Sequence, residues 1–284
     1  MPELTAAARY PAFLNTSAGG TSAALVALER DERFSIVATA PEALAESIRA
    51  AADRGERRVL VAGGDGTLRT AASAVAGTPV EMAVLPAGTL NHFAKRHRIP
   101  TDVAPALDVA VGVHTETADV GYVNEHLFLN TSSVGAYVTF VRTRERLERR
   151  LGYWIASLVA SLRILGEMRT FLVELEVEGA RKMYRSPLVF VGIGERELKL
   201  PALGGPAPNG RRGLHVMIVR GRTRAKLVAL AMAAAARGTR WLARTPHLDS
   251  FIVDRCRITM PRRLGRVAVD GEILLVAAPL EYTL

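Results

Sequence analysis

Short apolar runs alternate with helical patterns over the first hundred residues. Runs rich in Val, Leu and Ala predict buried strands at Pro11–Leu14, Phe34–Ala38, Val59–Ala62 and Glu81–Leu85. Between them, apolar residues recur with helical spacing, for example at Leu68, Ala71, Ala72 and Val75. Strands that alternate with helices in this way predict βαβ units and a parallel sheet.

Small polar turns follow each of these predicted strands. They are Asn15–Gly20, Thr39, Gly63–Thr67 and Gly88–Asn91. Because all strands of a parallel sheet end at the same edge, we expect the four turns to converge there. Together they would form a cradle for an anion or a nucleotide. For each turn alone, ordinary loop chemistry is the alternative.

The turn Gly63–Leu68 is the most informative of the four. A strand, a glycine turn and a helix start present free backbone N–H groups to a phosphate. Thr67 is expected to be the N-cap of the helix. The turn is neither a Walker A loop nor a dinucleotide fingerprint, because Arg69 stands at the third glycine position. Asp65 would repel phosphates unless a cation or a donor stands between them, and an ordinary turn residue is the alternative.

After Ile99-Pro100 the pattern changes to short strands separated by turns. They are expected at Ala118–Val123, Leu127–Asn130, Phe171–Glu178, Pro187–Gly192, Leu214–Val219, Ser250–Val253, Arg257–Met260, Arg266–Val269 and Ile273–Ala277. This spacing is typical of an antiparallel, sandwich-like β region. Helical insertions are expected near Val141–Leu165 and Arg224–Arg237. The sequence therefore predicts an α/β nucleotide-binding domain over 1–120 and a β-sandwich domain over 121–284.

Composition narrows the classes of partner and compartment. The 284 residues carry 37 Lys and Arg against 28 Asp and Glu, a net charge of +9 that favours polyanions or anionic membrane surfaces. A single cysteine, Cys256, excludes an internal disulfide and a multi-cysteine metal site, and it is expected in the core. No signal-peptide pattern is visible, and the longest apolar stretch, Leu227–Ala236, is too short to span a bilayer. We expect a cytoplasmic protein.

One segment combines basic and apolar residues. Arg142–Arg150 is rich in arginine and runs into Gly152-Tyr153-Trp154-Ile155 and further apolar residues. This order fits a helix that lies on a membrane surface. A solvated helix face followed by a core helix is the alternative.

Two motifs taken together resemble the diacylglycerol kinase catalytic family, in its bacterial lipid-kinase branch. They are Gly63-Gly64-Asp65-Gly66-Thr67 and Leu85-Pro86-Ala87-Gly88-Thr89-Leu90-Asn91-His92-Phe93-Ala94-Lys95. Weaker similarities follow in the same order as in the family, at Asn15–Gly19, Ser186–Gly192 and Val269–Glu272. The resemblance covers nearly the whole chain, and the family's α/β domain followed by a β-sandwich agrees with the strand pattern.

The resemblance implies a Mg²⁺- and ATP-dependent lipid kinase that transfers the γ-phosphoryl group to a diacylglycerol-like hydroxyl. It would act peripherally at the inner membrane face, in lipid metabolism and phospholipid biosynthesis. Glu272 would be the general base, with Asp270 nearby as a second catalytic residue. The residues implied at the nucleotide are Asn15, Thr16, Ser17, Gly19, Thr39, Gly64, Asp65, Gly66, Thr67, Leu68, Thr89 and Asn91. No nucleic-acid partner is expected, a homodimer is left open, and the metal ligands are unknown.

Departures from the family pattern keep other functions open. Arg69-Thr70 replaces an Asn-Glu pair, which removes a capping box, and His92 follows Asn91 where the family usually has Asp. Arg212 stands in a loop where the family often binds a structural magnesium, and arginine cannot ligate a cation. A kinase-like module that binds nucleotide or lipid with weak or no catalysis is therefore the alternative. NAD kinases share the Gly-Gly-Asp-Gly turn but lack the second motif, and a nucleic-acid role rests on net charge alone.

Overall fold

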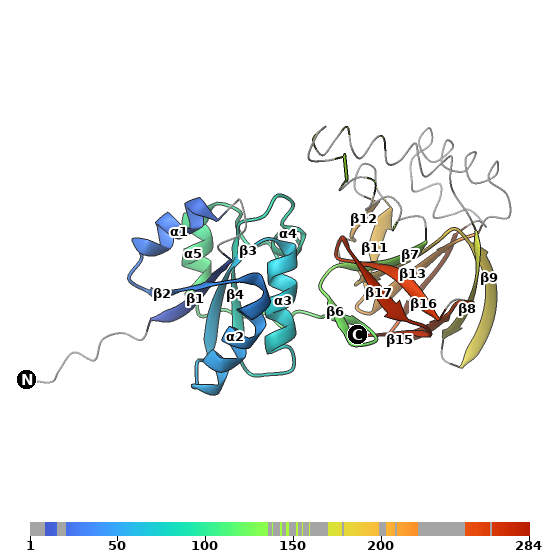
Figure 1. Cartoon of the computed structure of the whole chain (residues 1–284), viewed down its shortest axis with the longest axis horizontal. Helices are drawn as coiled ribbons and strands as arrows, with labels where there is room; N and C mark the ends of the chain where they lie inside the picture. Colours follow the sequence, from blue (N-terminus) through green and yellow to red (C-terminus); the bar gives the residue numbers. More distant parts are fainter. Residues whose placement is uncertain are drawn as a thin grey trace, which may run out of the picture. The chain divides into compact units, whose positions relative to one another are not determined.

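The structure is a computed structural model of the whole chain. It describes residues 9–15, 21–135, 170–177, 179–198, 203–207, 209–220, 248–261 and 263–284, with single residues between 138 and 159. The chain divides into two compact units, Met1–Ala118 and Asp119–Leu284 (Figure 1). Each unit is described by itself.

A parallel sheet forms the centre of the first unit. Its strands are β1 (Tyr10–Asn15), β2 (Phe34–Thr39), β3 (Arg58–Gly63) and β4 (Glu81–Pro86), in the spatial order β2-β1-β3-β4. The helices are α1 (Ser22–Glu29), α2 (Leu44–Asp53, after a 3₁₀ turn over Pro41–Ala43), α3 (Asp65–Val75), α4 (His92–Arg96) and α5 (Val103–Ala110). All four strands predicted over residues 1–100 are confirmed, and so is the prediction that they pair in parallel.

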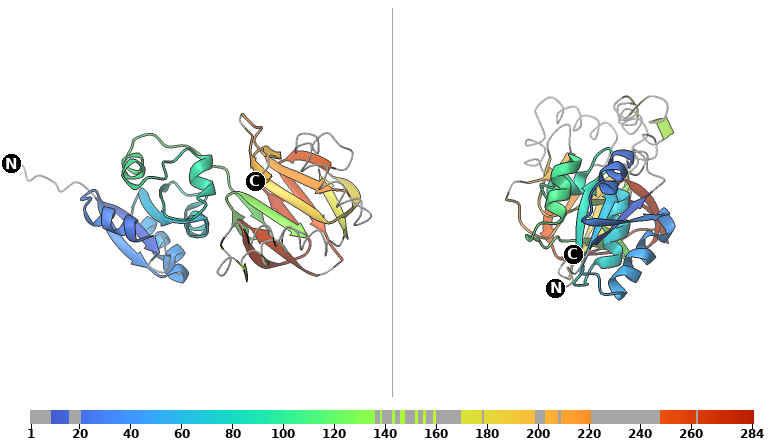
Figure 2. Two further views of the ribbon diagram at one scale, coloured as in Figure 1. Left: turned by 90° about the horizontal axis from the view of Figure 1, so that it is seen from above. Right: turned by 90° about the vertical axis from the view of Figure 1, so that its left-hand side faces the viewer.

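Helices cover both faces of this sheet. On one face, α1 and α5 pack on apolar residues of all four strands; on the other lie α2 and α3, which contact each other (Figures 1 and 2). The sequence pattern did not predict α5, because Pro105 interrupts its first turn. The first hydrogen bond of α5 is donated by the Ala106 N–H to the Asp102 carbonyl, so the missing N–H of Pro105 lies ahead of it and costs nothing.

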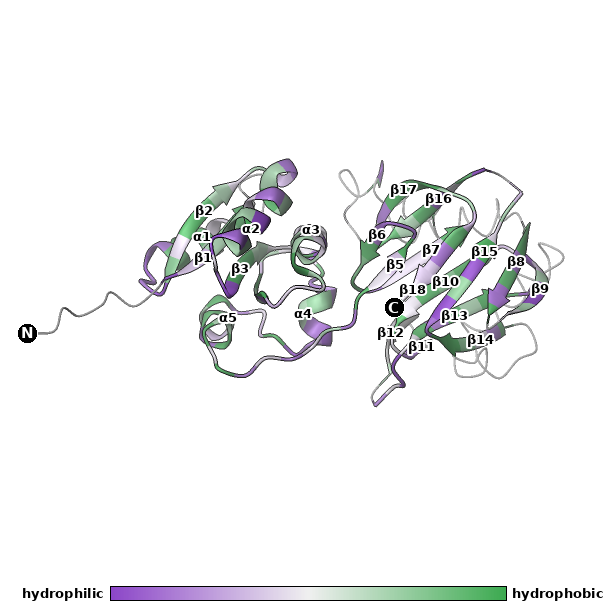
Figure 3. Ribbon diagram, turned by 90° about the horizontal axis from the view of Figure 1, so that it is seen from below, coloured by the Kyte–Doolittle hydropathy of each residue, from purple (hydrophilic) through white to green (hydrophobic). Residues whose placement is uncertain are grey.

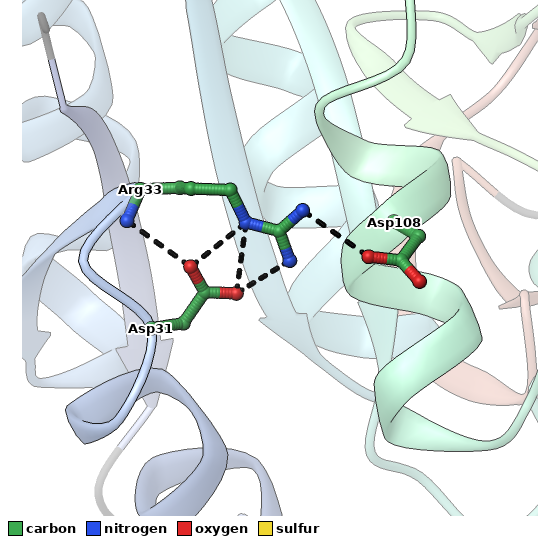
Figure 4. A network of polar contacts seen from close by, with 3 residues as sticks. All are labelled: Asp31, Arg33 and Asp108. Atoms are coloured by element: carbon green, nitrogen blue, oxygen red, sulfur yellow. Dashed lines mark hydrogen bonds and ion pairs between the residues drawn. The ribbon is translucent and has the colours of Figure 1, made fainter.

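Two arginines attach α5 to the rest of the unit. The Arg33 guanidinium lies between Asp31 and Asp108 of α5, at 2.6 Å and 3.1 Å (Figure 4). The hydrogen bonds from Arg33 hold the pKa of Asp31 below its usual value. Arg58 of β3 pairs with Glu81 and donates to the carbonyls of Ala110 and Gly112, which satisfies acceptors at the C-terminal end of α5.

The second unit is built from two six-stranded antiparallel sheets. One has the order β14-β13-β10-β7-β16-β17, formed by Leu248–Val253, Leu214–Val219, Leu188–Ile193, Thr131–Gly135, Leu264–Val269 and Glu272–Ala277. The other has the order β6-β5-β18-β15-β8-β9, formed by His126–Phe128, Gly121–Val123, Leu280–Thr283, Arg255–Thr259, Phe171–Val177 and Ala180–Ser186. A short hairpin pairs β11 (Arg196–Leu198) with β12 (Leu203–Pro206).

One hydrophobic core joins the two sheets. It takes buried residues from both, such as Val191 and Val267 from the first and Leu175 and Tyr282 from the second. Every second side chain of a strand points to the same face, so the alternation of apolar and polar residues along the strands produces this core. Figure 3 shows the hydropathy of each residue along these strands. Cys256 is buried in this core, as predicted. The prediction of a parallel α/β region followed by an antiparallel β region is confirmed.

The sequence missed five strands in this unit. They are β7, β9, β11, β12 and β18. Two of them lack an apolar signal: β7 reads Thr-Ser-Ser-Val-Gly, and β9 carries Arg181, Lys182 and Arg185. The expected helical segments 141–165 and 224–237 fall outside the described residues, apart from single positions in the first. Within the described part of the chain, no helix is long and apolar enough to cross a bilayer.

Candidate functional site

The strand order places a switch point between β1 and β3. The chain leaves β1 toward β2 on one side, and β3 pairs with β1 on the other. Ligands of open α/β sheets bind outside the carboxyl ends of the strands at such a point. Here those ends are Asn15 and Gly63. Thr16, Ser17 and Gly19, which follow Asn15, lie outside the described residues.

The turns after β3 and β4 lie against each other through their backbones. A Cβ added to Gly88 would meet the Gly64 Cα at 2.5 Å, and one added to Gly64 would meet the Gly88 Cα at 3.2 Å. The Ala87 N–H donates to the Gly63 carbonyl at 3.0 Å, which extends the β3–β4 pairing into the turns. Both positions therefore require glycine for close approach rather than for an unusual backbone angle.

Helix α3 begins directly after this contact. Its N-cap is Gly64, and the first helical hydrogen bond runs from the Leu68 N–H to the Gly64 carbonyl at 3.0 Å. The prediction that Thr67 is the N-cap is therefore wrong: Thr67 lies in the first turn, where its side chain packs over Gly63. The N–H groups of residues 65–67 precede the helical hydrogen bonds, so they can donate to an anion.

Asp65 ties the two turns together. Its carboxylate accepts the backbone N–H groups of His92 and Phe93, both at 3.0 Å, and so caps α4 from another element. A helix as short as α4, with five residues, needs such support because isolated short helices are unstable. The donors beside this carboxylate are protein N–H groups, where the sequence argument expected a cation or a hydroxyl donor.

Asn91 and its neighbours hold the second turn in shape. Asn91 has a left-handed backbone with φ 49°, and its side chain both accepts from the Gly88 N–H and donates to the Gly88 carbonyl. Thr89, between them, is exposed. At the end of β2, Thr39 is buried and donates to the Val37 carbonyl, and in α3 the Leu68 side chain is fully buried. Asn91 and Leu68 thus shape the site, and Thr89 is open to solvent.

In the second unit, Asp270-Gly271 forms the hairpin turn between β16 and β17. Both residues have positive φ, 47° and 92°, which fits the two-residue turn of type I′. Glu272 is the first residue of β17, lies opposite Val269 and is exposed. The segment Val269–Glu272, which resembles a family motif, is therefore part of a β-hairpin.

The Asp270 carboxylate is bound by the segment between β6 and β7. Its oxygens accept the N–H groups of Leu129 at 2.6 Å, Asn130 at 2.8 Å and Thr131 at 2.9 Å. The Asp270 N–H in turn donates to the Thr131 carbonyl at 2.8 Å. Asp270 was expected beside Glu272 as a catalytic residue; its contacts are those of an anchor.

A buried polar group lies behind this anchor, and sequence reasoning missed it. Arg196 is 7% exposed and donates to the Asn130 carbonyl at 2.7 Å, while its N–H donates to His215 Nδ1 at 2.8 Å. Nδ1 therefore accepts, so Nε2 carries the proton toward Ser250. Burial is the main cause that lowers the pKa of His215. No local pattern marks these residues, because their partners lie far away in sequence.

The loop that carries Arg212 forms an ion pair in place of a metal ligand. The Arg212 guanidinium donates to both carboxylate oxygens of Asp119, at 2.7 to 2.9 Å. In the neighbouring position, Arg211 contacts Glu195. Across the described residues, no three His, Cys, Asp or Glu side chains gather in a way that could hold a metal ion.

Comparison with known proteins finds a family model that matches the first unit. Residues 11–123 match the family model described as the diacylglycerol kinase catalytic domain. A Pseudomonas putida protein named "Probable lipid kinase YegS-like" is 38% identical over 144 residues, which are 49% of this chain and 47% of that protein. A Staphylococcus carnosus protein named "Diacylglycerol kinase" is 33% identical over 125 residues, 43% of this chain and 40% of that protein. The chain spans about half the length of the curated relatives it matches.

Solved structures extend the similarity of fold to both units. A chain from Bacillus anthracis str. Sterne superposes with a TM-score of 0.72 and 21% identity, over 97% of this chain and 93% of that one. A structure described as a diacylglycerol kinase from the same organism gives 0.63 at 18% identity, with the same coverage. These likenesses concern the fold.

Proposed function

Because residues 11–123 match the family model described as the diacylglycerol kinase catalytic domain, we propose that the chain is an ATP-dependent lipid kinase. It would transfer the γ-phosphoryl group of ATP to the hydroxyl of a diacylglycerol-like lipid at an anionic membrane surface. The cytoplasmic face is the expected place, because ATP is available there. The observation that carries the proposal is the backbone contact of Gly64 with Gly88, which brings the two family motifs together beside the start of α3.

The nucleotide would be held at the carboxyl edge of the parallel sheet. The N–H groups of residues 65–67 and the positive end of the α3 dipole suit phosphate oxygens. Two glycines without Cβ atoms let a phosphate approach the backbone closely. Asp65 and the Asn91 side chain would act by holding this turn rigid. Phosphoryl transfer depends mainly on such positioning and charge stabilisation.

Mg²⁺ fits this site as a companion of the nucleotide. The ion keeps several waters and binds to one or two carboxylates together with substrate phosphates. Asp65 is the carboxylate of this turn, and each of its oxygens keeps a lone pair beyond the N–H bond that it accepts. The ion would supply charge neutralisation on the transferring phosphoryl group.

Glu272 would accept the proton of the lipid hydroxyl. In that step the hydroxyl O–H bond breaks and the oxygen bonds to the γ-phosphorus, while the bond to ADP breaks. Glu272 is exposed at the start of β17, and the Asp270 anchor fixes the hairpin that carries it. A carboxylate that lies open to solvent and on a fixed turn can orient and deprotonate an alcohol.

The test is phosphate transfer from labelled ATP with Mg²⁺ to a panel of hydroxyl lipids in anionic mixed micelles. Glu272→Gln should lower kcat by roughly 10²-fold or more, with the ATP dissociation constant unchanged. Glu125→Gln is the matched control, since Glu125 is a turn residue of the same unit with an 88% exposed side chain. Turnover of Glu272→Gln within twofold of wild type would exclude Glu272 as the base. ATP binding without transfer to any lipid would favour a binding module.

A further inference from the structure

The outer face of the β16–β17 hairpin carries an exposed apolar pair with basic neighbours. Val267 and Val269 point into the core, so the alternate residues of the hairpin face outward. These alternate residues are Leu264, Arg266, Ala268, Ile273, Leu275 and Ala277. At the turn end, Ala268 is 1% exposed and packs with Val138 and Ile273, whereas the other four residues are exposed. Leu264 is 59% exposed and Leu275 is 65% exposed. We call Leu264, Arg266, Leu275 and the adjacent Arg263 the hairpin patch.

The register brings the two leucines together. Arg266 lies opposite Leu275 and Leu264 lies opposite Ala277, so the leucines are diagonal neighbours on one face. β17 is the last strand of its sheet (Figure 1), so Leu275 lies on the edge strand and Leu264 on β16 beside it. Neighbouring apolar side chains at an edge form a surface for contact rather than isolated exposed positions.

The charge of the hairpin patch has one sign. Its outward face carries no carboxylate, and within the described part of the chain neither Arg263 nor Arg266 forms an ion pair. Two leucines flanked by two uncompensated arginines match an interface that offers apolar chains beneath anionic headgroups. The chain's net charge of +9 acts in the same direction.

A second hairpin carries a similar pair of exposed apolar residues, but the charges around that pair are different. On the outer face of β8–β9, Leu172 and Met183 are 49% and 59% exposed, and they are diagonal neighbours in the same way. There, however, Glu174 lies opposite Met183, and Arg181 pairs with Glu174 and Glu176. With Arg185 opposite Leu172, that face carries two glutamates and two arginines and is charge-compensated. It serves as the control surface.

We propose that the hairpin patch docks the protein on an anionic bilayer, with Leu264 and Leu275 entering the headgroup region. This inference rests on the proposed function in one respect: a lipid substrate makes the bilayer the expected occupant. Glu272 lies three residues before Leu275 on the same strand, roughly 10 Å along it, at the turn end and on the other face of the hairpin. Docking by the hairpin patch would therefore bring the hairpin that carries the proposed base to the bilayer surface.

The experiment measures sedimentation of the full chain with phosphatidylcholine vesicles that contain or lack 30 mol% phosphatidylglycerol, roughly the anionic fraction that attracts basic patches. Leu275→Glu and the double variant Leu264→Gln/Leu275→Gln should each lower binding to anionic vesicles roughly tenfold or more. Arg266→Glu should lower it too and weaken its dependence on salt. Met183→Glu, the control, should bind as wild type does. The polar substitutions replace exposed side chains, so unchanged melting temperatures are expected.

Three results would overturn the inference. The first is that both leucine variants bind anionic vesicles within twofold of wild type. The second is that wild type binds vesicles without anionic lipid equally well. The third is that wild type is a dimer, which Leu275→Glu converts to a monomer while vesicle binding stays unchanged. The last would make the hairpin patch a contact between two copies. Vesicle binding needs no ATP, so binding by the hairpin patch without lipid phosphorylation would refute the proposed function alone. With both intact, the ratio of turnover on vesicles to turnover on dispersed short-chain lipid should fall at least tenfold in Leu275→Glu.

Discussion

Replacing Asp270 by Asn tests whether this residue is an anchor or a catalyst. The aspartate accepts three backbone N–H groups, from Leu129, Asn130 and Thr131, at 2.6 to 2.9 Å. Asparagine keeps the shape, but it offers one acceptor oxygen in place of two. Its NH₂ group would face either the Leu129 N–H or the pair from Asn130 and Thr131, so donors would meet donors.

The cost follows from the bonds that are lost. A hydrogen bond to a charged group contributes about 1.5 to 3 kcal/mol, and the remaining bonds weaken when the acceptor becomes neutral. We expect Asp270→Asn to lower the free energy of unfolding of the second unit by about 2 to 4 kcal/mol. Glu272→Gln, at the exposed end of the same hairpin, should change it by less than about 0.5 kcal/mol.

Urea titration followed by tryptophan fluorescence measures this difference. Both tryptophans, Trp154 and Trp241, belong to the second unit by sequence, so their emission reports that unit. Turnover adds a second readout: Asp270→Asn should lower kcat because Glu272 loses its support, with the ATP dissociation constant unchanged. An Asp270→Asn midpoint equal to that of wild type would refute the reasoning, because charge-assisted bonds cannot be lost or weakened without cost.

Three further variants probe other parts of the structure. Gly88→Ala places a Cβ 2.5 Å from the Gly64 Cα, so ATP affinity should fall at least tenfold by calorimetry, and wild-type affinity would contradict the backbone contact. Asp65→Asn removes charge from the cap of α4 and should lower the melting temperature of the first unit by a few degrees, with weaker ATP binding. Burial lowers the pKa of His215 in the folded state. The free energy that neutral His215 contributes to folding is therefore fully present above about pH 6.5, the unfolded pKa, and is lost as the pH falls through the lower pKa of the folded state. Denaturant titrations at pH 7.5 and 5.5 should show this loss in wild type and a smaller one in His215→Gln; equal losses would exclude His215 as the cause.

The sequence predicted the strands and turns at the carboxyl edge of the parallel sheet because their signals are local. Apolar runs of a few residues, each ended by glycine or a small polar residue, gave the four strands and the turns after them. Parallel topology predicts that the turns converge, and the contact of Gly64 with Gly88 confirms this for the turns after β3 and β4. The error at Thr67 was of a different kind. The helix starts as soon as β3 ends, so Gly64 is the N-cap, which the pattern of apolar positions cannot resolve.

The partners of the acidic residues were beyond sequence reasoning. Asp65 binds N–H groups 27 and 28 positions further on, and Asp270 binds groups about 140 positions earlier. Backbone N–H groups are present at every residue except proline, so nothing in a sequence marks which of them a carboxylate will accept. Buried Arg196 and His215 were missed for the same reason: their contacts are set by the pairing of strands that are distant in the chain.

The meeting of Gly64 and Gly88 also has a consequence for how the first unit opens. The contact exists only when β3 and β4 are paired. The two turns therefore cannot come together before these strands pair. The amide hydrogens of His92 and Phe93, held by Asp65, should then exchange with solvent only in openings that separate the two turns. A bound nucleotide would slow that exchange in proportion to its occupancy. The same two amides thus offer a readout of ligand binding that requires no catalysis.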